Sequence, residues 1–500
     1  MNKPTGLASQ APYAGAVGIE EWIQLYWGEK VHVFSRLDKG TSGVMVLALN
    51  ARAAQRADDL QKSGDSTKEY VFLSHADSLK IRKEQSWTIA SNVDGKSAKT
   101  DFTREGPAGK YFLYRAKISR GRLHQIRRHA KESKISILGD TEYQGQAFPR
   151  LCLHCKSTSW PEIPQTLVAP IPASMGSLGD FQNDAGFLAS FDRRLKFFTG
   201  VTDAFRCVHR GEMKALDCAI DFYAGYFCVW IYDENKATVE VCATLKPYLK
   251  KLTAVYGAIG TVIKRSLKNP HSKGLVQEQT ILGETPPPFF DVTEHGLKYQ
   301  VTLTEGQHVG LFLDQRDNRK RVLQMAAGQR VANLFAYTSS FSVAAAAACC
   351  DVVFSVDVAQ PCLDIGKINF EKNALFASNR GKFIKDDVRT WLKRQERKIK
   401  EQGDVAKFGV IICDPPTFSS TRDKGLFAVE KEWQALAQSC KNLLLPNGSA
   451  FFSTNHHEKS RDYYKKILQD TFKHVVDLPA PLDFPVINER ENVKLFYCSL

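Results

Sequence analysis

The sequence has no apolar run long enough to cross a lipid bilayer, because its longest such stretch covers only residues 343–350. Its first ten residues are polar and have no apolar centre, so we expect no secretory signal. These absences exclude a membrane-spanning or exported protein. We expect a soluble, cytoplasmic protein without a membrane partner.

The sequence also lacks a disulfide framework, since its 12 cysteines are scattered over 500 residues. Cys152, His154 and Cys155 have the spacing of the first half of a zinc site, but no second pair follows at a suitable distance. We therefore expect free thiols in a reducing compartment and no metal site.

Acidic residues are the minority among the charges: 54 Asp and Glu stand against 68 Lys and Arg, for a formal net charge of +14. Such an excess favours a polyanionic partner, because Lys and Arg release counterions from phosphates. The hydrophobic fraction of 43% is ordinary for globular protein, and the length suggests about three domains.

Apolar patterning divides the chain into regions. Strand-like runs occupy 44–49, 70–73 and 111–118, whereas four prolines and three glycines within 157–190 predict irregular chain before a domain boundary. Residues 205–209 and 227–231 are predicted to be strands, and a helix is predicted at 237–252. Three prolines at 286–288 end that region.

From about residue 291, strands and helices alternate. Strands are predicted at 331–335, 352–356, 408–413 and 450–453, with helices at 341–350 and 429–444, and a solvated helix end at 391–401. This alternation predicts a doubly wound, mostly parallel sheet with helices on both faces.

Ligands of such sheets bind at the carboxyl ends of strands. Three features fall there: the turn at 336–340, Asp357 at the end of the next strand, and Asp414 followed by two prolines, Thr417 and Phe418. An acid at a strand end accepts hydrogen bonds from ribose hydroxyls, and a stiff Pro-Pro loop holds an aspartate and an aromatic ring against a flat ligand. The order of the three features predicts a nucleoside-containing ligand.

The segments GLFLDQRDNRKRV, NLFAYTSSFSVAAAAACCDVVFSVD and VIICDPPTFSS resemble the RlmK/RlmI-type class I S-adenosylmethionine-dependent methyltransferases that act on large-subunit rRNA. The upstream segment FRCVHRGEMKALDCAIDFYAGYFCVWIYDE resembles the small α/β domain that precedes their Rossmann-like catalytic domain. This resemblance implies S-adenosylmethionine as the cofactor and large-subunit rRNA as the partner. The implied cofactor-binding residues are Asn333, Phe335, Tyr337, Thr338, Ser339, Asp357, Asp387 and Asp414, and the implied contacts to the base are Pro415, Pro416, Phe418 and Asn455.

This chain departs from the family at Ser339 and Ser340, where glycine is usual at one or both positions. Glycine permits positive φ and close approach of the backbone to a ligand, so serine could narrow the pocket. An alternative therefore stays open, in which the methyltransferase-like domain only grips RNA beside an active pseudouridine synthase; a further alternative is an assembly factor that uses basic surfaces alone.

The methylated base follows from a missing thiol. Formation of 5-methylcytosine needs a cysteine nucleophile, which related enzymes carry just after the strand that follows Asp-Pro-Pro. Here that segment is AFFSTNHHEKS, without cysteine, and strand alternation turns Cys413 away from Asp414. Guanine N7 has a free lone pair and needs no base, so we expect guanine N7, with 5-methylcytosine as the alternative.

The N-terminal third carries a second set of motifs. Arg36-Leu37-Asp38 precedes Thr-Ser-Gly at 41–43, Lys68-x-Tyr70 follows, and Gly-Arg-x-His-Gln-Ile-Arg covers 121–127. Residues 115–134 hold eight Lys or Arg and one acid, which suits phosphate contact. These motifs resemble the RluA-type pseudouridine synthases over about 170 residues.

That resemblance implies an α+β domain with a mixed, largely antiparallel sheet, and it implies residue roles. Asp38 is the carboxylate that drives detachment of uracil from its sugar, either by attack on the sugar or by proton removal. Arg36 fills the space of the flipped base, which offsets part of the unstacking cost. Tyr70 stacks on uracil, and Arg127 orients Asp38, with Arg122 as the substitute. No cofactor is implied.

The family normally has a strand before its Asn-Lys-Pro, here at 2–4, so we expect that strand and any preceding RNA-binding module to be missing. We expect a pseudouridine synthase domain at 1–175, a linker at 176–190, a small accessory α/β domain at 191–288 and a methyltransferase domain at 289–500. The combination predicts a bifunctional RNA-modification enzyme whose partner is RNA, not DNA, with its oligomeric state open.

Overall fold

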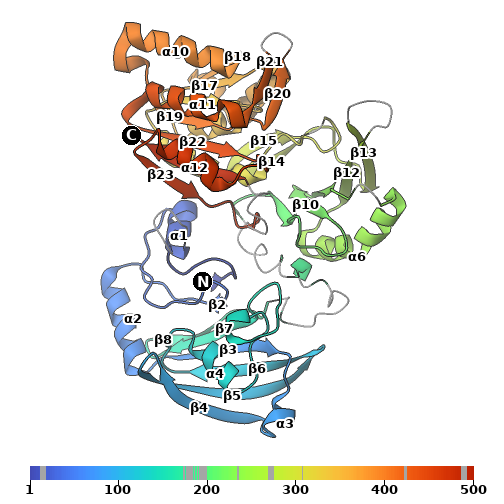
Figure 1. Ribbon diagram of the computed structural model, residues 1–500, viewed down its shortest axis with the longest axis vertical. Helices are drawn as coiled ribbons and strands as arrows, with labels where there is room; N and C mark the ends of the chain where they lie inside the picture. Colours follow the sequence, from blue (N-terminus) through green and yellow to red (C-terminus); the bar gives the residue numbers. More distant parts are fainter. Residues whose placement is uncertain are drawn as a thin grey trace. The chain divides into compact units, whose positions relative to one another are not determined.

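The structure is a computed structural model that describes residues 1–11, 18–172, 175, 184, 186–188, 190, 200–233, 236–268, 275–306, 308–421, 425–485 and 493–500. It divides into two compact units, the first built mainly from residues before 198 and the second mainly from residues after it (Figure 1). Within the described residues, no helix combines the length and apolarity needed to cross a membrane. All twelve cysteines are free thiols.

The first unit is built on one eight-stranded sheet. Its strand order is β1 (Asn2–Lys3), β2 (Ser42–Val44), β7 (Leu153–Trp160), β3 (Thr67–Ser74), β6 (Tyr111–Ile118), β5 (Lys96–Ala108) and β4 (Ser86–Val93), with β8 (Ile163–Val168) also paired to β7. Neighbours are antiparallel except for β2 and β7, which run parallel. Phe72, Phe102 and Tyr114 pack ring against ring in its core. The predicted α+β architecture with a mixed sheet is confirmed.

The helices that accompany this sheet include α1 (Ile19–Trp27), α2 (Ala51–Ser63), α3 (Ser78–Ile81) and α4 (Gln125–Glu132). Helix α2 begins at an Asn50 cap, whose side chain accepts a hydrogen bond from the Ala53 amide, and none of its residues is buried. Helix α4 differs, because it carries the buried Gln125, Ile126 and Arg127 into the sheet and so delivers the third N-terminal motif to the interior.

Two strand predictions for this unit were wrong. The run 44–49 contributes only Val44 to a strand, since β2 pairs with its neighbours over just three residues. The span 157–190 was expected to be irregular, yet β7 and β8 extend through residue 168. Pro161 lies in the turn between them and Pro164 lies in the edge strand β8, two places where a missing amide donor is tolerated.

The described residues of the second unit form two larger sheets and two hairpins. The smaller sheet has the order β13 (Leu275–Gly283), β12 (Gly260–Lys268), β11 (Tyr226–Ile231), β10 (Cys218–Tyr223), β9 (Ala204–Val208), and α6 (Thr238–Tyr256) connects β11 to its parallel neighbour β12. The first hairpin pairs β14 (Phe290–Glu294) with β15 (Leu297–Val301). The predicted strand at 205–209 and helix at 237–252 correspond to β9 and α6.

The larger sheet has seven strands in the order β18 (Gly381–Lys385), β17 (Val352–Asp357), β16 (Arg330–Leu334), β19 (Phe408–Cys413), β22 (Leu444–Thr454), β24 (Lys494–Ser499) and β23 (His474–Leu478). The first five run parallel, and β24 is antiparallel to both of its neighbours. A second hairpin joins β20 (Phe418–Thr421) to β21 (Gly425–Ala428).

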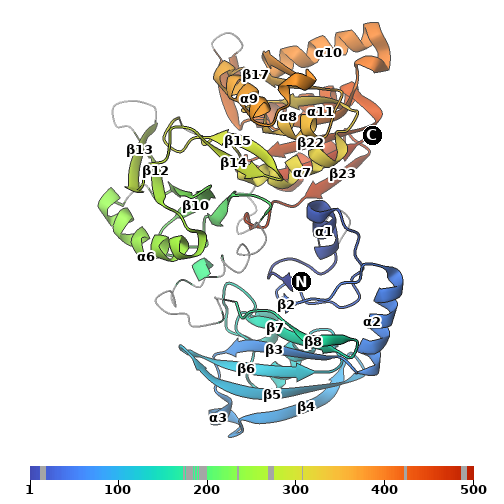
Figure 2. The same cartoon turned by 180° about the vertical axis from the view of Figure 1, so that it is seen from behind.

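Helices cover both faces of this sheet. The face seen in Figure 2 carries α7 (Arg316–Met325), α8 (Ser340–Ala347) and α9 (Gln360–Lys372), and the face seen in Figure 1 carries α11 (Val429–Leu443) and α12 (Arg461–Gln469), with α10 (Val388–Gln402) on that same side. The predicted doubly wound, mostly parallel Rossmann-like fold is confirmed. Helix α10 includes the charge-dense segment 391–401, although Trp391 and Leu392 on its inner face are buried.

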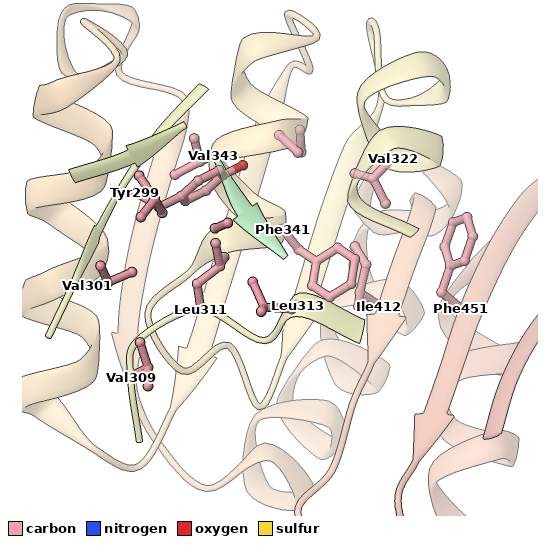
Figure 3. Close-up of a cluster of buried hydrophobic side chains, with 14 of the residues drawn as sticks. Tyr299, Val301, Val309, Leu311, Leu313, Val322, Phe341, Val343, Ile412 and Phe451 are labelled. Carbon is pink, nitrogen blue, oxygen red and sulfur yellow. The ribbon is translucent and has the colours of Figure 1, made fainter. Parts of the chain in front are cut away.

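One buried cluster joins the small sheet, the first hairpin and the large sheet. Tyr299 and Val301 of β15, Leu311, Phe341 of α8 and Ile412 of β19 belong to it (Figure 3). Because residues on both sides of position 288 share this core, they fold within one compact unit. The predicted division into 191–288 and 289–500 stays a prediction, and the predicted linker at 176–190 lies largely outside the described residues.

Candidate active sites

The first unit contains a cavity of about 640 Å³, which we call the basic cavity. Seven lysine and arginine side chains line it, against two aspartates. The charged lining residues are Arg36, Asp38, Asp58, Lys62, Lys68, Lys96, Arg120, Arg122 and Arg127, together with His124. All five residues predicted for this site, Arg36, Asp38, Tyr70, Arg122 and Arg127, line the same cavity, which suits an anionic ligand.

Asp38 lies in the loop that leads into β2. The Thr41 amide donates to its carbonyl at 3.0 Å, which closes the turn that presents the carboxylate to the cavity. The Asp38 carboxylate lies 3.5 Å from Arg127 Nη1 and 3.8 Å from His124 Nε2. The predicted proximity of Asp38 and Arg127 is therefore present.

Arg127 is held more tightly by other acids than by Asp38. Its guanidinium donates two hydrogen bonds of 2.7 Å to Asp140 and one of 2.8 Å to Glu142, and it stacks on the Tyr143 ring at 4.7 Å. Burial alone would lower the pKa of Arg127, but the hydrogen bonds to Asp140 outweigh it and raise that pKa. Arg127 is thus a fixed, permanently charged neighbour of Asp38.

Tyr70 projects from β3 and is only 6% exposed. Burial raises the pKa of its phenol well above the usual value, and the neighbouring Cys155 and Asp38 raise it further. The phenol is therefore protonated at neutral pH. Burial also raises the pKa of the Cys155 thiol, to about 11, so this thiol is protonated at neutral pH.

Arg36 and Arg122 lie at the wall of the cavity with different surroundings. Arg36 is exposed, which suits a side chain that replaces a flipped base. The Nε of Arg122 is buried, and no described residue supplies a hydrogen-bond partner for it, so a ligand can satisfy this donor.

Sequence reasoning missed Lys68 as a site residue, although it belongs to the Lys-x-Tyr motif. Its buried ammonium donates to Ser35 Oγ at 2.6 Å, and burial lowers its pKa. The signal was available, because residues two apart on a strand share a face, and Lys68 and Tyr70 of β3 both line the basic cavity.

The Thr-Ser-Gly turn at 41–43 allows β2 to approach β7 closely. Gly43 has φ of 118°, and a Cβ there would lie 2.1 Å from the Cys155 carbonyl oxygen of β7. Ser42 shares a hydrogen bond of 2.9 Å with His154 Nδ1 and accepts one of 2.7 Å from Arg150. The turn therefore locks the strand after Asp38 against β7.

The second unit contains a cavity of about 480 Å³ at the carboxyl ends of β16, β17 and β19, which we call the strand-end cavity. Ten predicted residues line it: Asn333, Phe335, Tyr337, Asp357, Asp387, Asp414, Pro415, Pro416, Phe418 and Asn455. The cavity therefore lies at the carboxyl ends of the strands, where the sequence analysis predicted a ligand site.

The turn after β16 forms one wall of this cavity through unusual backbone geometry. Phe335, Tyr337 and Ser339 have φ of 58°, 49° and 60°, values that L-residues adopt rarely. Such strain clusters at ligand sites. Asp357 braces the turn, because its carboxylate accepts hydrogen bonds of 2.8 Å from the amides of Tyr337 and Ala359.

Two predicted cofactor residues, Thr338 and Ser339, are absent from the described lining of the cavity. The Thr338 hydroxyl donates to the Gly310 carbonyl at 2.6 Å. Ser339 packs against α9, where a Cβ on Gly366 would lie 2.5 Å from its hydroxyl oxygen. The Ser339 side chain consequently does not narrow the cavity, whereas Ser340, the second position where the family usually has glycine, lines it.

Asp414 and the residues after it form the opposite wall. Ser453 Oγ donates to the Asp414 carboxylate at 2.5 Å, and burial raises the pKa of Asp414 to about 6. Thr417 Oγ donates to Asn455 at 2.7 Å, which ties the Pro-Pro loop to the end of β22. Phe418 is 57% exposed at this site, free to stack on a flat ring.

Asp387 caps α10 and accepts a hydrogen bond from the Thr390 amide. It also forms an ion pair of 2.9 Å with Arg389, which itself lines the cavity. Sequence reasoning missed the wall formed by His308, Phe312, Asp314 and Gln315. The signal was available, since three of these four residues lie in the GLFLDQRDNRKRV segment.

Comparisons with known proteins agree with this geometry. Residues 205–496 match the family model described as S-adenosylmethionine-dependent methyltransferase. The chain belongs to this family. Residues 1–132 match the model described as RNA pseudouridylate synthase, so the two recognised domains follow one another along the chain.

Curated relatives that match this chain are named as ribosomal RNA large subunit methyltransferases. Ribosomal RNA large subunit methyltransferase I of Erwinia tasmaniensis is 36% identical over 233 residues, which are 44% of this chain and 56% of the relative. The Enterobacter sp. protein of the same name is 35% identical over 54% of this chain and 65% of its own length. The chain thus spans less than two thirds of these relatives.

A solved structure of a methyltransferase complexed with SAH shares the fold at a TM-score of 0.53 and 27% identity. The likeness covers 63% of this chain and 80% of that chain. This match agrees with the doubly wound second unit.

Proposed function

We propose that the chain is a bifunctional RNA-modification enzyme. Its first unit converts uridine to pseudouridine, and its second unit transfers a methyl group from S-adenosylmethionine to an rRNA base. One observation carries this proposal: each compact unit has its own cavity, and each cavity collects the residues of a separate motif set.

In the basic cavity, Asp38 drives cleavage of the bond between uracil N1 and the ribose. The base then turns and forms a bond from its C5 to the same sugar carbon; C5 loses its proton and N1 gains one, so the net reaction is an isomerisation and needs no cofactor. The Arg127 guanidinium, held by Asp140, orients Asp38 and places a fixed positive charge beside it. Tyr70 supplies a neutral, buried ring for stacking on the uracil, and Arg36 occupies the space that the flipped nucleotide leaves.

The strand-end cavity fits S-adenosylmethionine through its donor set. Asp357 at the end of β17 suits ribose hydroxyls, and Asp387 with Val388 suits an adenine ring. When bound, this cofactor supplies an electrophilic methyl group on a sulfonium. The residues of the chain then align the acceptor atom, with Asp414 accepting hydrogen bonds from the base and Phe418 stacking on it.

We favour guanine N7 as the methyl acceptor over cytosine C5. No cysteine stands among the described residues that line the strand-end cavity. The Cys413 thiol is buried against Cys440 in the core beneath the helices, and burial raises its pKa well above the usual value. Without a thiolate nucleophile, 5-methylcytosine chemistry has no attacking group, whereas guanine N7 attacks with its own lone pair.

RNA is the proposed partner, and large-subunit rRNA is the proposed substrate. The net charge of +14 and the basic cavity suit phosphate, and the relatives are named for the large ribosomal subunit. Free thiols throughout the chain suit a cytoplasmic location.

Modification maps of rRNA from cells with and without the gene test the proposal. We expect one pseudouridine and one 7-methylguanosine to disappear together, and both to return when the gene is restored. Loss of a 5-methylcytidine in place of 7-methylguanosine would refute the choice of base. Calorimetric titration with S-adenosylmethionine addresses the RNA-gripping alternative, which predicts no binding even at millimolar cofactor.

A further inference from the structure

The second unit contains another cavity, of about 300 Å³, beside the strand-end cavity. Both cavities are bordered by His308, Phe312, Asp314, Tyr337 and Asn455. Phe312 and Tyr337 contact each other with ring centroids 5.2 Å apart, so an aromatic wall separates the two spaces.

The remaining wall comes from the small sheet and is rich in aromatic rings. Tyr223 of β10, Trp230 of β11 and Tyr232 just beyond it line the space, and Phe484 closes it. We call this space the aromatic cavity. Its volume lies at the low end of ligand sites, which run from about 300 to 1,000 Å³, and suits one nucleotide.

One ion pair, Arg206–Asp221, holds two of these rings, Trp230 and Phe484, in place before any ligand arrives. Asp221 accepts a hydrogen bond of 3.0 Å from Trp230 Nε1 and pairs with Arg206, whose guanidinium stacks on Phe484 at 4.5 Å. Asp221 is 2% exposed, so this network is buried. Preorganised rings lose little conformational entropy on binding, which favours affinity.

Tyr232 brings an exposed face to this site. Its side chain is 42% exposed, and the Arg210 guanidinium lies over its ring at 4.4 Å. Cations and aromatic faces together recognise single-stranded nucleic acid, because every base offers a π-face and every linkage a phosphate.

We propose that the aromatic cavity binds the nucleobase of a nucleotide that flanks the methylated one on the same RNA strand. The occupant is a single unstacked base, stacked on Trp230 and Tyr232. This role rests on the proposed function of the second unit. It gives the small sheet a defined part in recognition, because the sheet then selects RNA whose neighbouring nucleotide can leave its stack.

Ultraviolet crosslinking to deproteinised large-subunit rRNA tests the occupant directly. We expect peptide mapping by mass spectrometry to find crosslinks at Trp230 or Tyr232. Crosslinks at Phe418 with none at Trp230 or Tyr232 would overturn the inference. This assay needs no methyl transfer, so it decides the matter even if the methyltransferase activity proposed above is absent.

A matched pair of variants measures the contribution to RNA recognition. Tyr232→Ser should raise the KM for RNA about tenfold, in line with the loss of one base–aromatic stack, and leave the affinity for S-adenosylmethionine unchanged. Tyr463→Ser is the control, because Tyr463 of α12 is also exposed, at 37%, and also lies under a cation, Lys459 at 5.3 Å. It lines none of the three cavities.

An abasic nucleotide next to the target base separates stacking from general damage. It should weaken the wild-type enzyme's RNA binding about tenfold and the Tyr232→Ser enzyme's binding by less than about twofold. Equal weakening in both proteins, or an unchanged KM in Tyr232→Ser, contradicts the inference while methylation by the wild type still supports the proposed function. A wild type that transfers no methyl group contradicts that function instead.

Discussion

The Asp38 carboxylate lies between two nitrogen-bearing side chains, Arg127 and His124, in a cavity where positive charge prevails. The three N-terminal motifs predicted this acid, Tyr70 and three of the arginines that line the cavity. The motifs did not reveal that Asp140 and Glu142 hold Arg127, because sequence spacing does not say which acid reaches a given guanidinium.

Asp38→Asn should lower pseudouridine formation by at least about 100-fold, since it removes the carboxylate that we propose to react, with little change in volume. Asp58→Asn is the matched control, because Asp58 lines the same cavity but pairs with Lys62. We expect the control to keep most of its activity in a tritium-release assay on uridine-labelled RNA. Equal losses in both variants would contradict the assignment of Asp38.

Burial of the Asp414 carboxylate in the strand-end cavity lowers the free energy of unfolding at high pH, where this group is ionised. Burial raises its pKa to about 6 in the folded state, above the unfolded value of 3.8, so protonation favours the folded state. The resulting stabilisation is complete below pH 3.8 and is lost as the pH rises through 6. A sequence motif identifies Asp414, but its pKa depends on burial that only the fold supplies.

Asp414→Asn should therefore raise the melting temperature at pH 8 by a few degrees, from roughly 1–3 kcal/mol, while lowering methyl transfer at least about tenfold. The rate of wild-type methyl transfer should decrease when the pH is lowered below about 6, because a protonated Asp414 no longer accepts hydrogen bonds from a base on both oxygens. Thermal unfolding at about pH 5 and about pH 8 measures the first effect. Asp364→Asn, on the exposed face of α9, serves as control, and a variant at Asp414 that is less stable at pH 8 than the wild type would argue against the pKa assignment.

At the scale of elements, strands with mostly apolar sequences were predictable, whereas a long strand with a mostly polar sequence was not. β19 is buried at every residue, so its composition alone identified it. β5 is a strand of 13 residues that was missed, because one of its faces is exposed and its sequence is mostly polar. The register shift of the β3–β7 pairing between Glu69 and Tyr70 depends on pairing between distant segments and has no local signature.

The loop that carries Asp38 depends on one close approach between strands. Gly43→Ala should destabilise the first unit by roughly 3 kcal/mol or more, since its Cβ would lie 2.1 Å from the Cys155 carbonyl oxygen. Gly95→Ala is the control: Gly95 also has positive φ, 75°, but nothing lies within 4 Å of a Cβ there. That variant should lose only about 1–2 kcal/mol.

Differential scanning calorimetry and both activity assays test this pair. Gly43→Ala should lose pseudouridine formation and keep methyl transfer, because its clash is confined to the first unit. Similar melting temperatures for the two variants would show that the approach of β2 to β7 tolerates a methyl group.

At the scale of the whole molecule, the sequence predicted two recognisable domains in the correct order. The boundary between 288 and 289, drawn from a proline run, stays a prediction. Residues on both sides of it belong to one buried cluster, part of which Figure 3 shows, and local composition does not reveal such packing between distant segments. The basic cavity and the strand-end cavity lie in separate compact units and share no lining residue.

Separate cavities on one chain predict separable activities. The decisive measurement is a nucleoside-resolution map of rRNA from knockout cells that express either Asp38→Asn or Asp414→Asn. The account predicts that Asp38→Asn restores only the methylated base and that Asp414→Asn restores only the pseudouridine. If either variant removes both modifications while its protein remains folded, or if both variants restore both, two independent active sites on this chain are contradicted.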